Sequence, residues 1–253
     1  MTQAAPTGGA RRVALVANTD FYIGPPLARL LAARGHDLVI GDPLPGLVEE
    51  LEALGAAVEV VTDVKDLSDP AASERLVAAG LDRFGHLDSA AAFSGRVVVG
   101  RFLQSSIDDL RAVFSGCLEA PYHFLKAVVP PMVERGEGQV LVVTSASGAR
   151  ATPGAPLYSS VRAGANHLVR NVADEVARNG VQVNAVGTNF MDFPEFLRAT
   201  GGTDPEVRAK LEAAVPMRRL GTVEECAAMC AVFVDGTSRF TTGQFVAYAG
   251  GWA

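Results

Sequence analysis

The chain has 253 residues, of which 49% are hydrophobic, and this size suits one α/β domain with one sizeable core. The formal net charge is −6 and no basic run occurs, which argues against nucleic acid and anionic membranes as partners. No apolar stretch reaches the roughly 18 residues of a membrane span. Residues 1–12 lack the order of charges and apolar residues that a signal peptide has, so we expect residues 1–10 to be a disordered tail.

Short apolar runs alternate with amphipathic segments along the rest of the chain. The runs are rich in Val, Ile, Leu and Ala, which is typical of strands buried on both faces of a parallel sheet. They predict strands over residues 13–18, 37–42, 57–63, 88–94, 139–145, 181–186 and 244–249. Apolar residues at three- and four-residue spacing predict helices over residues 24–35, 73–84, 107–135, 158–179 and 222–235. The alternation predicts a doubly wound sheet of seven parallel strands with helices on both faces, in one domain over residues 11–253.

One polar stretch, residues 190–220, departs from this alternation. It follows the sixth predicted strand and contains Gly201, Gly202 and the pair Asp204–Pro205. We therefore predict an excursion or lid over a site rather than a second domain.

The cysteines and histidines show no metal-ligand spacing. Cys226 and Cys230 share one face of a predicted helix, where small buried thiols are expected, and Cys117 stands apart. We interpret the four histidines as surface or packing residues: His36, His86, His123 and His167. The sequence predicts no metal site and a protein of the reducing cytoplasm.

Three residues around the fifth predicted strand suggest proton transfer. Ser145 ends that strand, at the edge where open α/β sheets bind ligands. Tyr158 and Arg162 are four residues apart, so they share one face of a helix. A free phenol is a poor base at neutral pH, but a nearby guanidinium favours the phenolate. The Tyr–Arg pair alone is more typical of helix packing. With Ser145 holding a substrate oxygen against the phenol, the three residues predict removal of a proton from an alcohol.

Residues 11–251 resemble the short-chain dehydrogenase/reductase superfamily. Ser145, a gap of twelve residues and Tyr158 match the catalytic spacing of that superfamily. The pair Asp63–Val64 and the closing sequence TTGQFVAYAGG also match its landmarks. The resemblance implies a Rossmann-like fold. The superfamily has a lysine where this chain has Arg162, and that lysine also binds the nicotinamide ribose.

The cofactor landmarks of the superfamily are altered in this chain. In the glycine-rich loop, the superfamily's threonine falls on Ala17 and its three glycines fall on Asn18, Tyr22 and Gly24. A tyrosine in place of the second glycine would put a ring where the diphosphate approaches the backbone. Residues 92–95 read AFSG where the superfamily has Asn-Asn-Ala-Gly, and Cys117 replaces an asparagine.

This combination of replacements resembles one branch of the superfamily, the halohydrin dehalogenases. The resemblance implies that Ser145 binds the substrate oxygen, Tyr158 removes its proton and Arg162 tunes Tyr158. It also implies a halide pocket, formed partly by backbone N–H groups, with five residues: Tyr22, Thr188, Asn189, Phe190 and Met191. The implied protein is a cytoplasmic homotetramer that needs no cofactor. Its implied reactions are conversion of vicinal haloalcohols to epoxides and halide, and opening of epoxides by azide, cyanide or nitrite.

Two other functions stay open. Asp42 ends the second predicted strand, where NAD-binding members hold the adenosine ribose. Asp42 and Asp63 are more typical of ordinary loop starts or relics, but they are also consistent with an NAD(P)-dependent oxidoreductase that has a degenerate glycine loop. The second is a non-catalytic scaffold of the same fold. The branch usually has a threonine at Ala17, and some members have proline at Thr188. Resemblance also suggests that Trp252 packs at a subunit contact.

Overall fold

The structure of the protein is a computed structural model that describes residues 11–93 and 95–253. The tail expected at residues 1–10 and Ser94, the last residue of the fourth predicted strand, lie outside the described residues. Among the helices of the described part, none is both long and apolar enough to cross a membrane.

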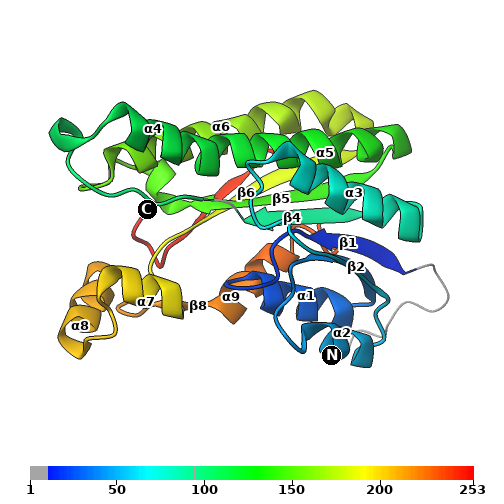
Figure 1. The fold of residues 1–253 in the computed structure, drawn as a ribbon, viewed down its shortest axis with the longest axis horizontal. Coiled ribbons are helices and arrows are strands. Elements are labelled where there is room, and N and C mark those ends of the chain that lie inside the picture. The colour runs from blue at the N-terminus through cyan, green and yellow to red at the C-terminus, as the bar shows by residue number, and fades with distance from the viewer. Residues whose placement is uncertain (1–10, 94) are drawn as a thin grey trace.

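A parallel sheet forms the centre of the molecule (Figure 1). In the described residues it has seven strands in the order β3-β2-β1-β4-β5-β6-β9, which confirms the predicted doubly wound fold. The strands are β1 Arg12–Val16, β2 His36–Gly41, β3 Val58–Val61, β4 Ser89–Phe93, β5 Gly138–Ser145, β6 Val181–Thr188 and β9 Phe245–Tyr248. The strand order reverses between β1 and β4, and such a reversal opens a crevice beyond the carboxyl ends of the strands.

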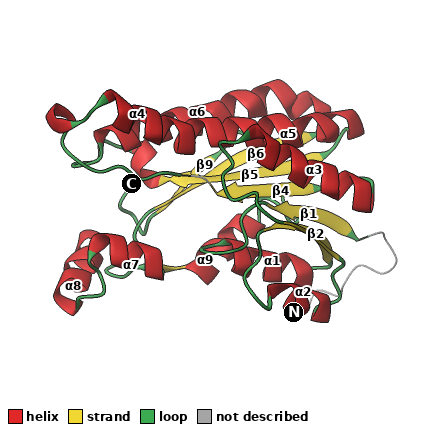
Figure 2. Cartoon of the chain, in the orientation of Figure 1, coloured by secondary structure: helices red, strands yellow, loops and turns green. Residues whose placement is uncertain are grey.

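Helices cover both faces of the sheet, as Figure 2 shows. One layer contains α3 Pro70–Phe84, α4 Ile107–Phe114, α5 Ala120–Arg135 and α6 Pro156–Val176. The other contains α1 Gly24–Ala33, α2 Leu47–Ala53 and α9 Val223–Ala231. Each layer buries its own apolar cluster against the sheet, one built on Leu76, Phe124 and Val142, the other on Leu27, Ile40 and Leu141. Burial of these aliphatic faces is the main force that fixes the layers.

The structure differs from the predicted elements in several places. The helix predicted over residues 107–135 is divided by a π-helical turn, Ser115–Glu119, which joins α4 to α5. Helix α2 was not predicted, because its seven residues are too short to show a clear apolar period. Helix α9 stops at Ala231, four residues before the predicted end.

The excursion after β6 is itself helical. It consists of β7 Met191–Asp192, α7 Pro194–Thr200, α8 Pro205–Ala214 and β8 Gly221–Thr222, with β7 paired to β8. Figure 1 shows α7 and α8 standing beyond the layer of α1 and α9, on the side of the sheet where β6 ends. The guanidinium of Arg208 on α8 binds the carboxylate of Asp192 at 2.6 Å, so α8 is tied back to β7.

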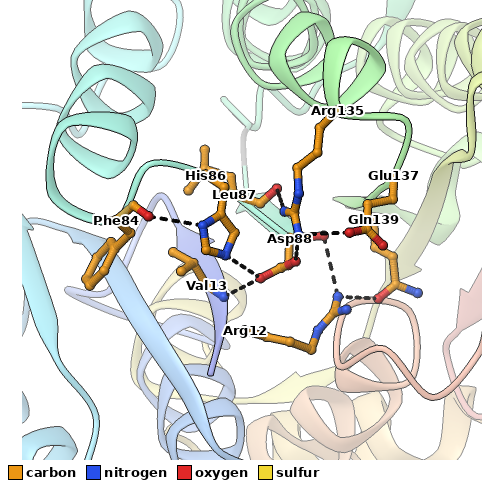
Figure 3. A network of polar contacts seen from close by, with 9 residues as sticks. All are labelled: Arg12, Val13, Phe84, His86, Leu87, Asp88, Arg135, Glu137 and Gln139. Atoms are coloured by element: carbon orange, nitrogen blue, oxygen red, sulfur yellow. Dashed lines mark hydrogen bonds and ion pairs between the residues drawn. The ribbon is translucent and has the colours of Figure 1, made fainter. Parts of the chain in front are cut away.

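The opposite, amino-terminal edge of the sheet carries a network of charges (Figure 3). Asp88, just before β4, accepts a hydrogen bond from the backbone N–H of Val13 at 2.6 Å. The same carboxylate binds Arg135 at 2.8 Å and lies 3.2 Å from His86 Nε2. Because Asp88 is 6% exposed, this ion pair joins β1, β4 and α5 inside the protein.

Candidate active site

Ser145 is the last residue of β5 and lies opposite Thr188, the last residue of β6. Its hydroxyl donates to the backbone oxygen of Thr188 at 3.3 Å and accepts from the N–H of Ser147 at 3.1 Å. The side chain is therefore held at the carboxyl edge of the sheet, as predicted.

Tyr158 and Arg162 lie in the first turns of α6. The start of that helix is fixed beside Ser145, because the Ser159 hydroxyl donates to the backbone oxygen of Ser147 at 2.8 Å. The guanidinium carbon of Arg162 lies 5.2 Å from the centre of the Tyr158 ring. Arg162 is 3% exposed. Burial lowers its pKa, but the charges of Tyr158 and Cys117 and a hydrogen bond to Tyr158 outweigh burial, so the pKa is raised overall.

Tyr22 crosses from the β1–α1 loop to the end of β6. Its hydroxyl donates to Thr188 Oγ1 at 2.8 Å, and its ring centre lies 4.3 Å from that of Phe193. Its backbone is left-handed, with φ of 57°, a conformation that is uncommon for a bulky residue. Burial, followed by the neighbouring Cys226, raises the pKa of Tyr22 well above its ordinary value, so the hydroxyl keeps its hydrogen at neutral pH. Thr188 thus links Tyr22, through its hydroxyl, to Ser145, through its carbonyl.

The loop of residues 188–191 was expected to bind a halide partly through its backbone N–H groups, but two of these groups are engaged within the protein. The N–H of Asn189 donates to the oxygen of Tyr248 at 3.4 Å, and the N–H of Phe190 donates to Asn189 Oδ1 at 2.9 Å. The Met191 side chain is 2% exposed and belongs to the apolar core. Two backbone N–H groups expected to face an anion are therefore satisfied within the protein. The Thr188 hydroxyl is the donor that this geometry offers instead, because the Tyr22 hydroxyl already donates its hydrogen to Thr188 Oγ1.

The sequence analysis missed a feature at the start of α1. The first three residues of this helix are Gly24, Pro25 and Pro26. The prolines have no N–H, and the Gly24 N–H donates to the oxygen of Phe21 at 3.3 Å. A Cβ on Gly24 would lie 1.8 Å from the backbone oxygen of Asn18, so this glycine is needed for loop packing. The two prolines in the sequence GPP already indicate that this helix start has few free N–H groups.

Phe93 and Phe193 were also missed, because one is inside a strand and the other precedes α7. Both rings contact the ring of Tyr22. Across residues 11–93 and 95–253, no group of His, Cys, Asp and Glu side chains could hold a metal ion.

Two cavities flank the site without containing its hydroxyls. One, of about 240 Å³, lies behind the loop of residues 188–191 and is lined by Phe190, Met217 and Tyr248 among others. A second of about 240 Å³ lies beside Leu157, under residues 98–105.

Comparison with known proteins agrees with this fold. Residues 19–253 match the family model described as enoyl-(acyl carrier protein) reductase. A solved structure of a short-chain type dehydrogenase/reductase from Mycobacterium ulcerans superposes with a TM-score of 0.86 at 25% identity, over 95% of this chain and 89% of that one.

Curated relatives are similar along nearly the whole chain. The cis-4-hydroxycyclohexanecarboxylate dehydrogenase of Sinomonas cyclohexanicum is 33% identical over 252 residues, covering 96% of this chain and 97% of the relative. Oxidoreductase UcpA of Escherichia coli K12 is 28% identical over 239 residues, covering 92% and 90%. Both relatives are named for redox reactions, and neither is named as a dehalogenase.

Proposed function

The chain belongs to the short-chain dehydrogenase/reductase family, and within it we propose a cofactor-independent dehalogenase that converts vicinal haloalcohols to epoxides and halide. The observation that carries this proposal is the hydrogen bond from Tyr22 to Thr188. It places a neutral phenol and a threonine hydroxyl beside Ser145, where relatives of this fold would need room for a cofactor. A hydroxyl group beside the rings of Tyr22, Phe93 and Phe193 suits a halide better than a nucleotide.

The residues at the start of α1 do not fit a dinucleotide. A diphosphate at a helix N-terminus is bound by free backbone N–H groups. Here Pro25 and Pro26 have none and the N–H of Gly24 is engaged. Asp42, the residue expected to hold an adenosine ribose, accepts the N–H groups of Asp63 and Val64 at 2.8 and 2.9 Å. The proposed reaction therefore uses no nicotinamide cofactor.

The proposed mechanism uses the groups already described. The substrate hydroxyl lies between Ser145 and Tyr158, and Ser145 exchanges its bond to Thr188 for one to the substrate oxygen. Tyr158 takes the hydroxyl proton as the C–O bond of the epoxide forms and the carbon–halogen bond breaks. The halogen leaves with the bonding electrons as halide, toward Tyr22 and Thr188. Because nucleophile and leaving group belong to one molecule, the protein need only hold them anti to one another.

Arg162 supports the base in this mechanism. Its buried guanidinium lies against Tyr158 and favours the phenolate that accepts the proton. The reverse reaction, attack of azide, cyanide or nitrite on an epoxide, follows from the same contacts.

An NAD(P)-dependent oxidoreductase is the second candidate, and the names of the relatives favour it. It predicts alcohol oxidation that requires added NAD⁺ or NADP⁺. The third candidate, a non-catalytic scaffold, predicts binding without turnover.

One experiment separates the three. The purified protein is incubated with a panel of vicinal bromo- and chloroalcohols without cofactor, and halide and epoxide are measured together. We expect equal amounts of both from the wild type, and none from Tyr158→Phe, which lacks the proton acceptor. In parallel, NADH and NADPH are titrated by fluorescence and thermal shift. Saturable binding at micromolar cofactor, with alcohol oxidation and no halide release, would replace the dehalogenase by the oxidoreductase.

A further inference from the structure

We propose that Trp252 is a positioning residue, which holds the loop of residues 188–191 in place through Phe190 and is itself held by Arg150. The part of this proposal that concerns halide affinity rests on the proposed function. The part that concerns the position of the loop does not, and it has its own readout.

Trp252 contacts both loops that border the candidate site. Its indole lies edge-on to the Phe190 ring, with ring centres 5.5 Å apart and planes at 64°. Arg150 stands over the indole, with its guanidinium carbon 4.8 Å from the ring centre. Arg150 also donates through Nη1 to the backbone oxygen of Trp252 at 2.7 Å. Figure 1 shows the C-terminus beside the layer of α4 and α6, on the side that faces α7.

Arg150 belongs to the segment that carries Ser145. Its backbone oxygen accepts the hydroxyl of Ser159 at 2.9 Å, and the same hydroxyl binds Ser147. Ser147 in turn donates its N–H to Ser145. The Arg150 guanidinium, which contacts Trp252, therefore belongs to a segment whose backbone is fixed relative to Ser145. A cation stacked on an indole and bonded to its backbone holds both the ring and the chain.

Phe190 needs such support because its backbone is left-handed, with φ of 55°. A bulky residue keeps this conformation only when its surroundings determine it. The Phe190 oxygen accepts the N–H of Gly221 at 3.0 Å, and its ring meets Phe196 at 6.3 Å as well as Trp252. Two residues earlier, Thr188 binds both Tyr22 and Ser145. Release of the Phe190 ring would therefore loosen the group that links these two hydroxyls.

The predicted consequence is a change in binding rather than in the proton-transfer groups. Ser145, Tyr158 and Arg162 are held by the backbones of β5 and α6, and Phe190 and Thr188 link Trp252 to the Ser145 hydroxyl. Loss of the indole should raise KM and weaken halide inhibition while kcat changes less. An aromatic pair of this kind corresponds to about a two- to ten-fold change in affinity. A merely structural role would lower the amount of active protein and leave KM unchanged.

The first test uses the fluorescence of Trp252, the only tryptophan of the chain. Arg150→Ala should shift the emission to longer wavelength and increase quenching by acrylamide, because the indole becomes wetter. Arg178→Ala, which removes an exposed arginine from the 3-10 turn Ala177–Asn179 after α6, is the matched control and should leave the emission unchanged. Unchanged emission and quenching in Arg150→Ala would show that Arg150 does not hold Trp252, whatever reaction the protein catalyses.

The second test compares Trp252→Ala with Trp252→Phe. With a haloalcohol, we expect Trp252→Ala to raise both KM and the bromide inhibition constant about two- to ten-fold, and Trp252→Phe to restore most of the loss. If the wild type releases no halide, the proposed function fails, and KM is then measured for the alcohol that it oxidises. Equal KM values in the wild type and Trp252→Ala, with either substrate, would overturn the positioning role.

Discussion

At the scale of single residues, Thr188 joins the parts of the candidate site. Its hydroxyl accepts the hydrogen of Tyr22 and its carbonyl accepts that of Ser145. A proline at this position, as some halohydrin dehalogenases have, would keep the carbonyl and lose the hydroxyl. Tyr22 therefore depends on this chain's own threonine for its buried hydrogen bond, and Ser145 depends only on the backbone.

Replacement of Thr188 by valine should test that link. Valine keeps the shape of threonine but leaves the Tyr22 hydroxyl without an acceptor, which costs about 1–3 kcal/mol when the group is buried. We expect a lower midpoint of thermal unfolding and weaker inhibition by bromide. Thr188→Ser keeps the hydroxyl and is the control. Equal bromide inhibition in the valine and serine variants would remove Tyr22 and Thr188 from the halide pocket.

Arg162 permits a prediction about pH. In the proposed mechanism Tyr158 is the base, and the buried guanidinium of Arg162 lies against its ring, where a cation favours a negatively charged neighbour. The stabilisation persists while the guanidinium is charged, at any working pH. Arg162→Ala should therefore reduce halide release and move the remaining activity to higher pH. Arg170→Ala, an exposed arginine of the same helix, should change neither rate nor pH profile. A normal rate at pH 7 in Arg162→Ala would limit Arg162 to a packing role.

At the scale of elements, the sequence predicted the strands of the sheet better than the details of its helices. The buried positions of the parallel strands are mostly Val, Ile, Leu and Ala, and this composition is visible without any knowledge of their partners. The π-helical turn Ser115–Glu119 has no such pattern, because it differs from an α-helix only in which carbonyl each N–H meets. Of the candidate site, Ser145, Tyr158 and Arg162 were predicted from their spacing, whereas the contact of Phe193 with Tyr22 needed the tertiary structure.

The π-helical turn and the exit of β4 together enclose Arg162. The N–H of Arg96 meets Cys117 Sγ of this turn at 3.4 Å, and Gly95 lies against the guanidinium. A Cβ on Gly95 would stand 2.0 Å from Arg162 Nη2. No sequence pattern reveals this contact, because it joins residues that are far apart along the chain.

Gly95→Ala should therefore displace the arginine. We expect halide release to fall about as far as in Arg162→Ala, with the same movement of the pH profile. Gly100→Ala is the matched control, since Gly100 has a similar φ, 151° against 157°, and no atom within 4 Å of a Cβ there. The backbone penalty is then common to both variants, and the contact with Arg162 is the difference. Equal activity in the two alanine variants would show that Arg162 tolerates displacement.

At the scale of the whole molecule, the two edges of the sheet have different tasks. The carboxyl edge carries Ser145, Thr188 and the loops of the candidate site, where backbone strain and engaged hydroxyls gather. The amino edge carries the Asp88 network, which ties β1, β4 and α5 together far from those loops (Figure 3). Changes at the amino edge should accordingly alter stability and leave the chemistry of the site intact.

The variant Asp88→Asn should lower the free energy of unfolding by an amount that depends on pH, while KM and kcat stay unchanged. Burial alone would raise the pKa of Asp88, but the N–H of Val13 and the guanidiniums of Arg135 and Arg12 lower it overall. A carboxyl whose pKa is lower in the folded state stabilises the fold above its unfolded pKa, and this contribution is lost as the pH falls toward the folded value. We expect the free energy of unfolding of Asp88→Asn to be lower by about 3 kcal/mol at pH 7. This value is at the low end for a broken buried ion pair, because the Arg135 side chain keeps contact with water.

The difference between wild type and Asp88→Asn should stay constant from pH 7 to about 5 and shrink as the pH falls further, through the unfolded pKa of about 4 toward the lower folded pKa. Urea unfolding at a series of pH values measures it, with KM and kcat recorded at pH 7 for both proteins. Asp108→Asn is the control, because Asp108 is also paired with an arginine but is 84% exposed, and surface pairs contribute little. A difference that also stays constant below about pH 4 would mean that the carboxylate's charge does not stabilise the fold. A raised KM in Asp88→Asn would mean that the two edges of the sheet are coupled.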